Sequence, residues 1–294
     1  MFHRPALLVA VLAVWPAVAA VAHPTDQPGA LPMSPRQAAK STAWKIRPAS
    51  DPLGFSVHLE PAQPTAGEPF WLSYRFTTAT GTPPDLAVSH EHLSHLIVVS
   101  EDLAYFNHVH PEQVAPGKFM IQLALPAGGK YILYADATPA SQHPIVKQVE
   151  LTVRGAPADK SPLVATPAMQ TQPPYSAHLV LDPDPLKAGG GMVTFHLLKD
   201  GQPASDIRPY LGAGGHLVVI SADTTEFLHA HPVEAGAMAG GDHAAHSGHA
   251  GASPAPRSEV AFHVEFPHPG LYKAWGQFLG AQGVVTFPYV IEVR

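Results

Sequence analysis

The chain has 294 residues, a formal net charge of −6 with neutral histidines, and no cysteine. The negative charge argues against nucleic acid or an anionic membrane surface as a partner, because both repel it. Without cysteine there are no disulfides, so any transition metal must be held by His, Met, Asp or Glu.

The N-terminal segment has the pattern of a secretory signal. Arg4 precedes an apolar stretch at 6–15, and Ala20-Val21-Ala22 forms a small-residue cleavage site, which predicts a signal peptide over residues 1–22. No later run reaches 18 apolar residues, so we expect no membrane span. The sequence therefore predicts a periplasmic or secreted protein, whose residues 23–51 form a flexible lead rich in Pro, Ala, Ser and Gln.

Two stretches of short apolar runs follow, at 52–154 and 175–294, joined by a Pro/Ala/Thr-rich linker at 155–174. Each stretch has seven strand-like runs separated by Gly and Pro turns, without a convincing helical pattern. In the first stretch the runs are 54–59, 70–76, 95–100, 105–110, 119–125, 131–135 and 145–153. In the second they are 175–181, 192–198, 216–221, 226–231, 260–266, 272–277 and 284–293. We expect an all-β protein of two tandem immunoglobulin-like or cupredoxin-like β-sandwiches related by internal duplication.

The clearest repeat is a 17-residue phrase. Residues 95–111 recur as residues 216–232, with 9 of the 17 positions identical. Three of the identities are histidines, the commonest metal-ligating side chain in proteins. The repeat therefore indicates a function for three pairs of histidines: His95 and His216, His108 and His229, and His110 and His231.

Each copy of the phrase reads as an antiparallel hairpin with a four-residue turn. If Ser100 faces Tyr105, then His95 lies opposite His110 and His108 lies on the same face. Directly opposed residues have Cβ atoms roughly 5 Å apart, which suits imidazoles that converge on one ion. The same pairing in the second copy brings together His216, His229 and His231. A register slip of one residue would separate these side chains.

These spacings predict metal ligation, with His90 or Glu91 as a fourth ligand to the set His95, His108 and His110. Copper is favoured over zinc because it heads the affinity order for nitrogen ligands. The alternative interpretation is that the histidines are structural and hydrogen-bond loop carbonyls at a sandwich corner. A metalloprotease is rejected. His90-Glu91 and His95 are spaced one residue too far apart for the helical zinc-protease motif HExxH, and this segment abuts a strand.

The second stretch contains an insert of 20 residues within 235–257, recognised from a change of repeat offset from 121 to 141. It is dominated by Gly and Ala and carries His243, His246 and His249, so we expect a mobile loop that binds metal loosely. The alternative is a low-complexity spacer. Outside the phrase and the insert, five histidines are interpreted as sandwich histidines with structural roles: His58, His143, His178, His263 and His268.

The phrases His95-Leu-Ile-Val-Val-Ser with Phe106-Asn-His108-Val-His110-Pro, and His216-Leu-Val-Val-Ile-Ser, resemble a family of exported bacterial proteins. That family has tandem HLVVxS…FxHxHP domains that are loosely similar to YtkA-like domains. The resemblance covers about residues 53–294. It implies a tandem β-sandwich and an association with heavy-metal handling, and it supplies no reaction.

The favoured function is an exported protein that binds a metal ion, copper before zinc, for sequestration or delivery to a periplasmic metal-handling partner. The alternative is a structural or partner-binding sandwich module whose histidines brace loops. A third possibility is a His-metal oxidoreductase. The sequence has no Ser-His-Asp elbow, phosphate loop or dinucleotide fingerprint, so it favours a role without catalysis and leaves enzymatic activity undecided.

Overall fold

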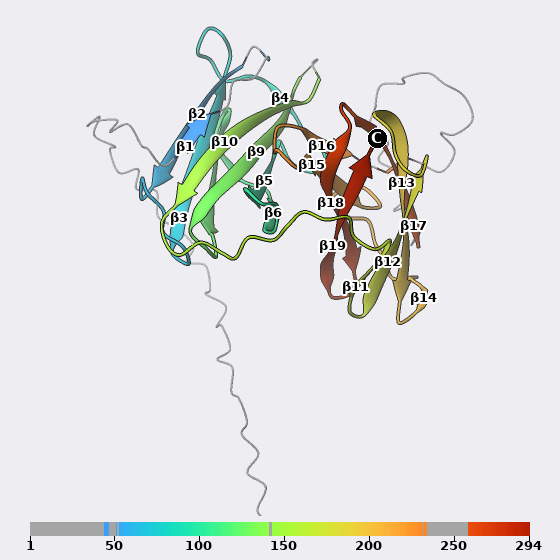
Figure 1. The fold of residues 1–294 in the computed structure, drawn as a ribbon. Coiled ribbons are helices and arrows are strands. Elements are labelled where there is room, and N and C mark those ends of the chain that lie inside the picture. Colours follow the sequence, from blue (N-terminus) through green and yellow to red (C-terminus); the bar gives the residue numbers. More distant parts are fainter. Residues whose placement is uncertain (1–43, 47–50, 52, 141–142, 231, 234–257) are drawn as a thin grey trace, which may run out of the picture. The chain divides into compact units, whose positions relative to one another are not determined.

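The computed structural model describes residues 44–46, 51, 53–140, 143–230, 232–233 and 258–294 (Figure 1). Within these ranges every regular element is a strand, and every ladder between strands is antiparallel. No helix that could span a membrane is therefore found in the described part of the chain.

The first lobe consists of two sheets. Its larger sheet has the order β1-β10-β9-β5-β6, with β4 paired to β9, and its smaller sheet has the order β2-β3-β8-β7. The strands are β1 (Trp44–Ile46), β2 (Gly54–Glu60), β3 (Pro69–Thr77), β4 (Leu86–Ala87), β5 (Ser94–Ser100), β6 (Phe106–Val109), β7 (Glu112–Ala115), β8 (Lys118–Ala124), β9 (Gly129–Pro139) and β10 (Ile145–Val153).

The second lobe repeats this plan. One sheet has the order β11-β12-β13-β14, with β17 paired to β13, and the other has the order β16-β15-β18-β19. The strands are β11 (Met169–Gln172), β12 (Tyr175–Asp182), β13 (Gly189–Lys199), β14 (Gln202–Pro203), β15 (His216–Ser221), β16 (Phe227–Ala230), β17 (Glu259–Phe266), β18 (Gly270–Gly280) and β19 (Gly283–Val293).

Each lobe encloses its own apolar core between its two sheets. In β17 the side chains alternate between exposed and buried, as expected for a strand with one face on the core and one in water. The first core is built from β2, β3 and β8 against β5, β9 and β10, and the second from β12, β13 and β17 against β15, β18 and β19. The prediction of two all-β sandwiches related by duplication is confirmed.

Strands β5 and β15 differ from this alternation, because nearly all of their residues are buried. Leu96 and Val98 pack into the first core, whereas Ile97 and Val99 belong to a third apolar cluster. This cluster also contains Val218 of β15, so it joins the two lobes. The continuous apolar runs at 95–100 and 216–221 thus reflect burial on both faces.

Several short strands were not expected from the sequence, among them β11, which lies inside the predicted linker at 155–174 and pairs with β12. The predicted signal peptide, nearly all of the predicted lead at 23–51 and the predicted loop at 235–257 lie outside the described residues.

A cluster of histidines between the lobes

The hairpin register expected from the repeated phrase is confirmed in both lobes. In the first, Ile97 pairs with His108. In the second, Val218 pairs with His229. The ladder between β5 and β6 ends at Leu96, so His95 lies one residue beyond the last pair. A register slip of one residue, which would have separated the histidines, does not occur.

The structure brings histidines of both lobes into one group, whereas the sequence suggested a separate set in each lobe. Neighbouring ring centroids in the group lie between 4.0 and 6.4 Å apart. We refer to this group as the histidine cluster; its members are His90, His92, His95, His108, His110, His216 and His229.

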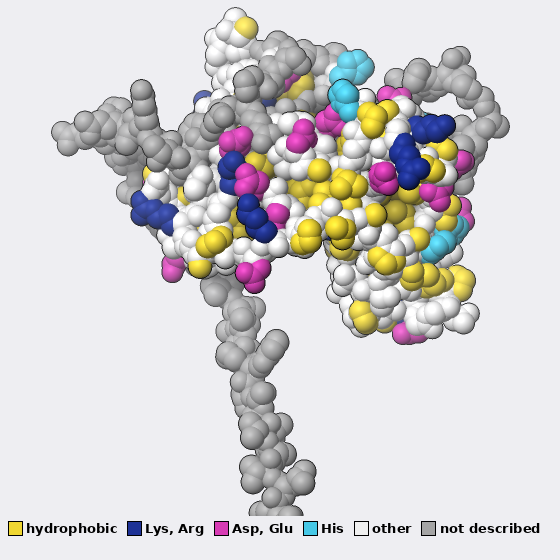
Figure 2. Space-filling view, in the orientation of Figure 1, with side chains coloured by type: hydrophobic (Ala, Val, Ile, Leu, Met, Phe, Trp, Pro, Cys, Tyr) yellow, Lys and Arg dark blue, Asp and Glu magenta, His cyan; other side chains and the backbone are white. Residues whose placement is uncertain are grey.

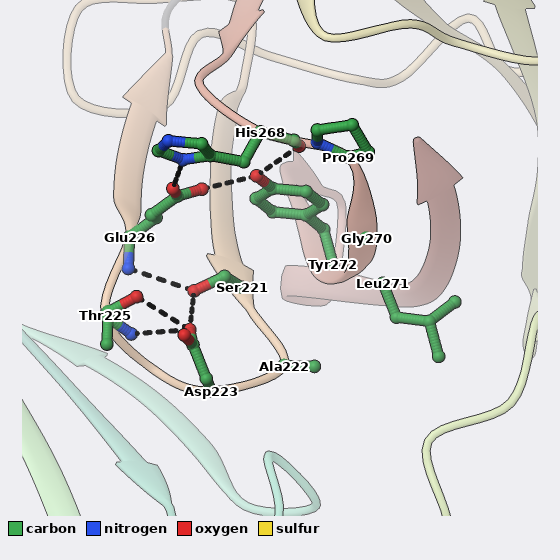
Figure 3. Close-up of a pocket in the computed structure, with 10 residues that line it drawn as sticks. All are labelled: Ser221, Ala222, Asp223, Thr225, Glu226, His268, Pro269, Gly270, Leu271 and Tyr272. Atoms are coloured by element: carbon green, nitrogen blue, oxygen red, sulfur yellow. Dashed lines mark hydrogen bonds and ion pairs between the residues drawn. The ribbon is translucent and has the colours of Figure 1, made fainter. Parts of the chain in front are cut away.

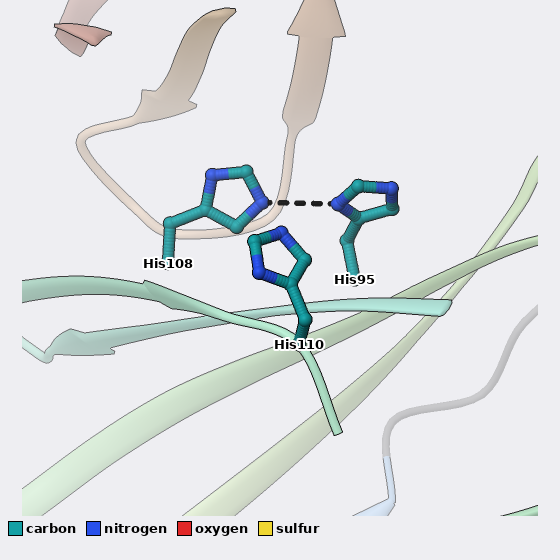
Figure 4. Close-up of side chains that lie close together, drawn as sticks. All are labelled: His95, His108 and His110. Carbon is teal, nitrogen blue, oxygen red and sulfur yellow. Dashed lines mark hydrogen bonds between the residues drawn. The ribbon is translucent and has the colours of Figure 1, made fainter. Parts of the chain in front are cut away.

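Three members of the cluster have the geometry of a metal site. His95, His108 and His110 each offer a ring nitrogen, and these three atoms lie within 4.8 Å of one another (Figure 4). The Nδ1 atom of His95 lies 3.2 Å from the Nε2 atom of His108. Two nitrogens that ligate one ion tetrahedrally at 2.0–2.1 Å stand about 3.3 Å apart. The facing nitrogens of His95 and His108 therefore have the spacing of two ligands of one ion.

The hydrogen bonds of the other ring nitrogens fix which tautomers these rings adopt. The Nε2–H of His95 donates to the carbonyl oxygen of Ser89 at 2.9 Å. The Nδ1–H of His108 donates to the side-chain oxygen of Gln277 at 2.7 Å. In neutral rings the two nitrogens that face each other are consequently both unprotonated, and their lone pairs point together. A proton or a metal ion between them would remove this repulsion.

Burial argues against a proton between the facing nitrogens of His95 and His108. Desolvation lowers the pKa of His95 to about 4, an effect that its hydrogen bond to Ser89 only partly offsets. Desolvation also lowers the pKa of His108 and, together with the neighbouring imidazoles, holds the pKa of His110 far below its usual range. The Nε2 atom of His110 is buried and has no hydrogen-bond partner among the described residues. The three rings are thus neutral at physiological pH, the protonation state that metal ligation needs.

Two polar residues that the sequence interpretation missed hold the cluster across the lobes. Gln277 accepts the bond from His108, and Asp136 accepts a bond from the Nδ1–H of His229 at 3.0 Å. Burial raises the pKa of Asp136 to about 6, and the nearby histidines oppose that rise. Asp136 and Gln277 occupy equivalent positions in the repeat, since they lie 141 residues apart and face His95 and His216 on neighbouring strands. Each lobe thus anchors a histidine of the other.

A tight turn carries two further members of the cluster. The backbone of Ser89 exchanges two hydrogen bonds with that of His92, and both intervening residues have positive φ, 49° at His90 and 66° at Glu91. This is the geometry of a two-residue hairpin turn, which disfavours side chains other than Asn, Asp and Gly. The ring of His92 stacks on that of His110 with centroids 4.0 Å apart. His92 was not among the predicted ligands.

The remaining predicted site residues fall into two groups. The His90 ring lies 5.2 Å from that of His216 in the second lobe and 6.4 Å from that of His95, whereas Glu91 is exposed on the turn. Histidine side chains occupy little of the face drawn in Figure 2, where acidic and basic groups are interspersed. Four predicted ligands lie outside the described residues: His231, His243, His246 and His249.

A pocket of about 350 Å³ in the second lobe is the other candidate site (Figure 3). The carboxylate of Glu226 accepts hydrogen bonds from the Tyr272 hydroxyl and the His268 ring. Asp223 accepts bonds from Ser221 at 2.6 Å and from the turn backbone. The same Ser–Asp bond recurs between Ser100 and Asp102 in the first lobe. These groups therefore act as turn supports, and we place no ligand here.

Comparison with solved structures gives low overall similarity. The chain covers 66% of the FdeC adhesin of Escherichia coli with 83% of its own length, at 15% identity and a TM-score of 0.26. It covers 56% of a DUF4785 family protein from Legionella pneumophila with 83% of its own length, at 10% identity and a TM-score of 0.29. It covers 97% of a two-domain fibronectin type-III segment of chicken tenascin with 81% of its own length, at 11% identity and a TM-score of 0.21.

The chain thus spans less than two thirds of the first two of these chains. No curated protein matches it. A family match covers both lobes, at residues 50–155 and 175–294, and its description is a domain of unknown function. With both lobes matched, the chain belongs to the DUF8832 family.

Proposed function

We propose that this protein binds one transition-metal ion in the histidine cluster, with His95, His108 and His110 as ligands. The observation that carries the proposal is the 3.2 Å distance between Nδ1 of His95 and Nε2 of His108. The other nitrogen of each ring donates a hydrogen bond to a carbonyl oxygen, so the two facing nitrogens both present lone pairs. The unpartnered, buried Nε2 atom of His110 supplies a third nitrogen. A metal ion would satisfy all three atoms at once.

Copper is the metal that we favour, with zinc as the alternative. Three neutral imidazoles form a nitrogen donor set, and for such a set Cu(II) has the highest affinity among the common divalent ions. The predicted signal peptide fits an exported protein, in which a site without cysteine suits an oxidising compartment. The role would then be sequestration of the ion or its delivery to a metal-handling partner in the periplasm.

A second candidate function is a structural or partner-binding module in which the histidines brace the two lobes. The reciprocal bonds of His108 to Gln277 and of His229 to Asp136 favour it, because each crosses between the lobes. This candidate requires no ion and predicts that the cluster contributes to stability alone.

Calorimetric titration of the full chain with Cu(II), and separately with Zn(II), distinguishes the two functions. The first predicts a tight phase of one ion per chain, with a dissociation constant below about 1 μM, or about −8 kcal/mol. Replacing His108 and His110 by Ala should abolish this phase. The matched control replaces His58 and His143, both exposed, and should leave it unchanged.

Because His108 is buried, the double variant can lose binding through a folding defect. The single variant His110→Ala, which keeps His108, is therefore titrated as well. Thermal unfolding of the metal-free proteins shows whether each variant is folded. A folded His110→Ala protein that retains the tight phase rules out the proposed ligand set and leaves the bracing function. Oxidase activity of the copper-loaded protein would instead support the third possibility, a His-metal oxidoreductase.

A further inference from the structure

The outer face of the β12–β13–β17 sheet carries a second group of possible metal donors, which does not include the proposed ligands His95, His108 and His110. His178 on β12 is the register partner of His196 on β13, and His196 is the partner of Glu259 on β17. On the other side of His178, the row continues to Met169 on β11. Four neighbouring strands thus contribute one donor each to a single row across the sheet.

Adjacent side chains along this row lie close to one another. The ring centroids of His178 and His196 lie 6.2 Å apart, within the span of about 5–6.5 Å that two imidazoles can have around one ion at 2.0–2.1 Å. The Nδ1 atom of His196 lies 3.5 Å from a carboxylate oxygen of Glu259. We propose that His178, His196 and Glu259 form a surface site for a divalent ion of the Cu(II) or Zn(II) type. The Met169 thioether lies at the end of the row.

The site is separate from the histidine cluster. The neighbours of His178 along the strand, Ala177 and Leu179, are buried in the core of the second lobe, so His178 itself faces solvent on the opposite side of the sheet. The same alternation places His196 between the buried Phe195 and Leu197. His178, interpreted from the sequence as a sandwich histidine with a structural role, thus lies on the solvent side of its sheet. Because different residues form it, the site does not depend on the proposed function of the cluster.

The first lobe lacks this pair and provides a natural control. There His58 is also exposed on the outer face of its sheet, but its register partner is Ser73, and the next residue in the row is Met120. His58 has the Glu60 carboxylate 4.0 Å away but no second imidazole beside it, whereas the second lobe offers two imidazoles and a carboxylate. Histidines directly opposite each other across strands repel when both are protonated. A shared ion makes the arrangement favourable.

The test is calorimetric titration with Zn(II) alone, and with Cu(II) alone, in full-length protein carrying His243→Ala, His246→Ala and His249→Ala. These substitutions remove the three histidines of the insert that precedes β17 in sequence. In that background His178→Thr/His196→Thr should lose one bound ion, and His58→Thr should lose none. Threonine is chosen because it favours strands and leaves the core untouched. Glu259→Gln should weaken the same phase.

Equal numbers of bound ions in the His178→Thr/His196→Thr and His58→Thr proteins would overturn the proposal. The outcome is distinguishable from a failure of the cluster site. If His110→Ala leaves the tight phase intact while His178→Thr/His196→Thr removes an ion, the surface site stands and the proposed function falls. If the tight phase depends on His110 and no ion depends on His178, the reverse holds.

Discussion

Phe106 of the first lobe stacks on Trp275 of the second, with ring centroids 4.6 Å apart and planes inclined by 16°. The repeat counterparts make the reciprocal contact, since Phe227 stacks on Tyr134 at 4.7 Å and 18°. Each lobe therefore offers the same two aromatic positions to the other. This reciprocity is the mark of an isologous, two-fold interface. The two lobes associate as a pseudo-dimer within one chain, and the histidine cluster lies in that association.

The interface should make a large contribution to stability. Trp275 is almost fully buried in the apolar cluster that joins the lobes, so Trp275→Ala should lower the free energy of unfolding by about 3–5 kcal/mol. Urea denaturation measures the change. The control is Trp71→Ala, because Trp71 is 43% exposed on an outer sheet face and should have a much smaller effect. Equal losses for the two variants would mean that the inter-lobe contact is not a stabilising core.

A second prediction concerns the residue that fixes the tautomer of His108. Gln277→Leu removes the acceptor for the Nδ1–H, so the Nε2 lone pair is no longer held toward His95. Loss of such an outer partner typically weakens metal binding by about 10–100-fold, and we expect this loss for Cu(II) in a competition titration.

The matched control for Gln277→Leu is Asp136→Asn, at the equivalent position of the first lobe. Asp136 accepts a hydrogen bond from His229, which is not one of the three proposed ligands. Asp136→Asn should therefore weaken copper binding less than Gln277→Leu does. If Asp136→Asn weakens copper binding more than Gln277→Leu does, the ligands are the histidines of the second lobe.

Much of this arrangement follows from the sequence. The turn length between Ser100 and Tyr105 and the period of two along a strand suffice to place His108 opposite Ile97, and the structure has this register. The positions of turns and apolar runs likewise predict the two sandwiches. Local pairing is predictable because a register slip would expose an entire apolar face.

The docking of the lobes could not be predicted in the same way. An uninterrupted apolar run such as 216–221 shows that both faces are buried, but it does not say what covers the second face. Asp136 and Gln277 are each flanked along the strand by residues without polar side chains. Only the repeat offset of 141 relates the two positions to each other. That offset was a usable signal. The repeat does not mark His92, whose counterpart in the second copy is Ala213; only its place just before the strand, beside His90 and Glu91, points to it.

The metal-free protein should lose stability as the pH falls from about 6.5 to about 4. An unfolded histidine takes up a proton near pH 6.5, whereas burial lowers the pKa of folded His95 to about 4. The unfolded state therefore binds more protons across this window, and acid favours it. Burial also lowers the pKa values of His108 and His229, which adds to the loss. Asp136 acts in the opposite direction, because its pKa is raised to about 6 from 3.8.

Urea denaturation of the metal-free protein at several pH values between 7 and 4 measures this dependence. His110→Ala should have a shallower profile, because it removes one of the histidines whose pKa is held low. Bound metal should also persist below pH 6.5, where exposed histidine sites release it. A wild-type profile that is flat over this range would mean that the cluster is hydrated and not buried.

The last prediction separates the structural role of the turn from ligation. Glu91 has a φ of 66°, and its counterpart in the second copy is Gly212, with a φ of 73°. A non-glycine residue in this conformation costs of order 1 kcal/mol, so Glu91→Gly should raise the free energy of unfolding by up to about 1 kcal/mol. Conversely, Gly212→Ala should lower it by about 1 kcal/mol through backbone strain alone, since a Cβ there would meet no atom within 4 Å. Because the Glu91 side chain is exposed, Glu91→Gly should leave the copper affinity unchanged. A weaker affinity in this more stable protein would identify Glu91 as the fourth ligand, and the turn strain would then be retained for metal binding.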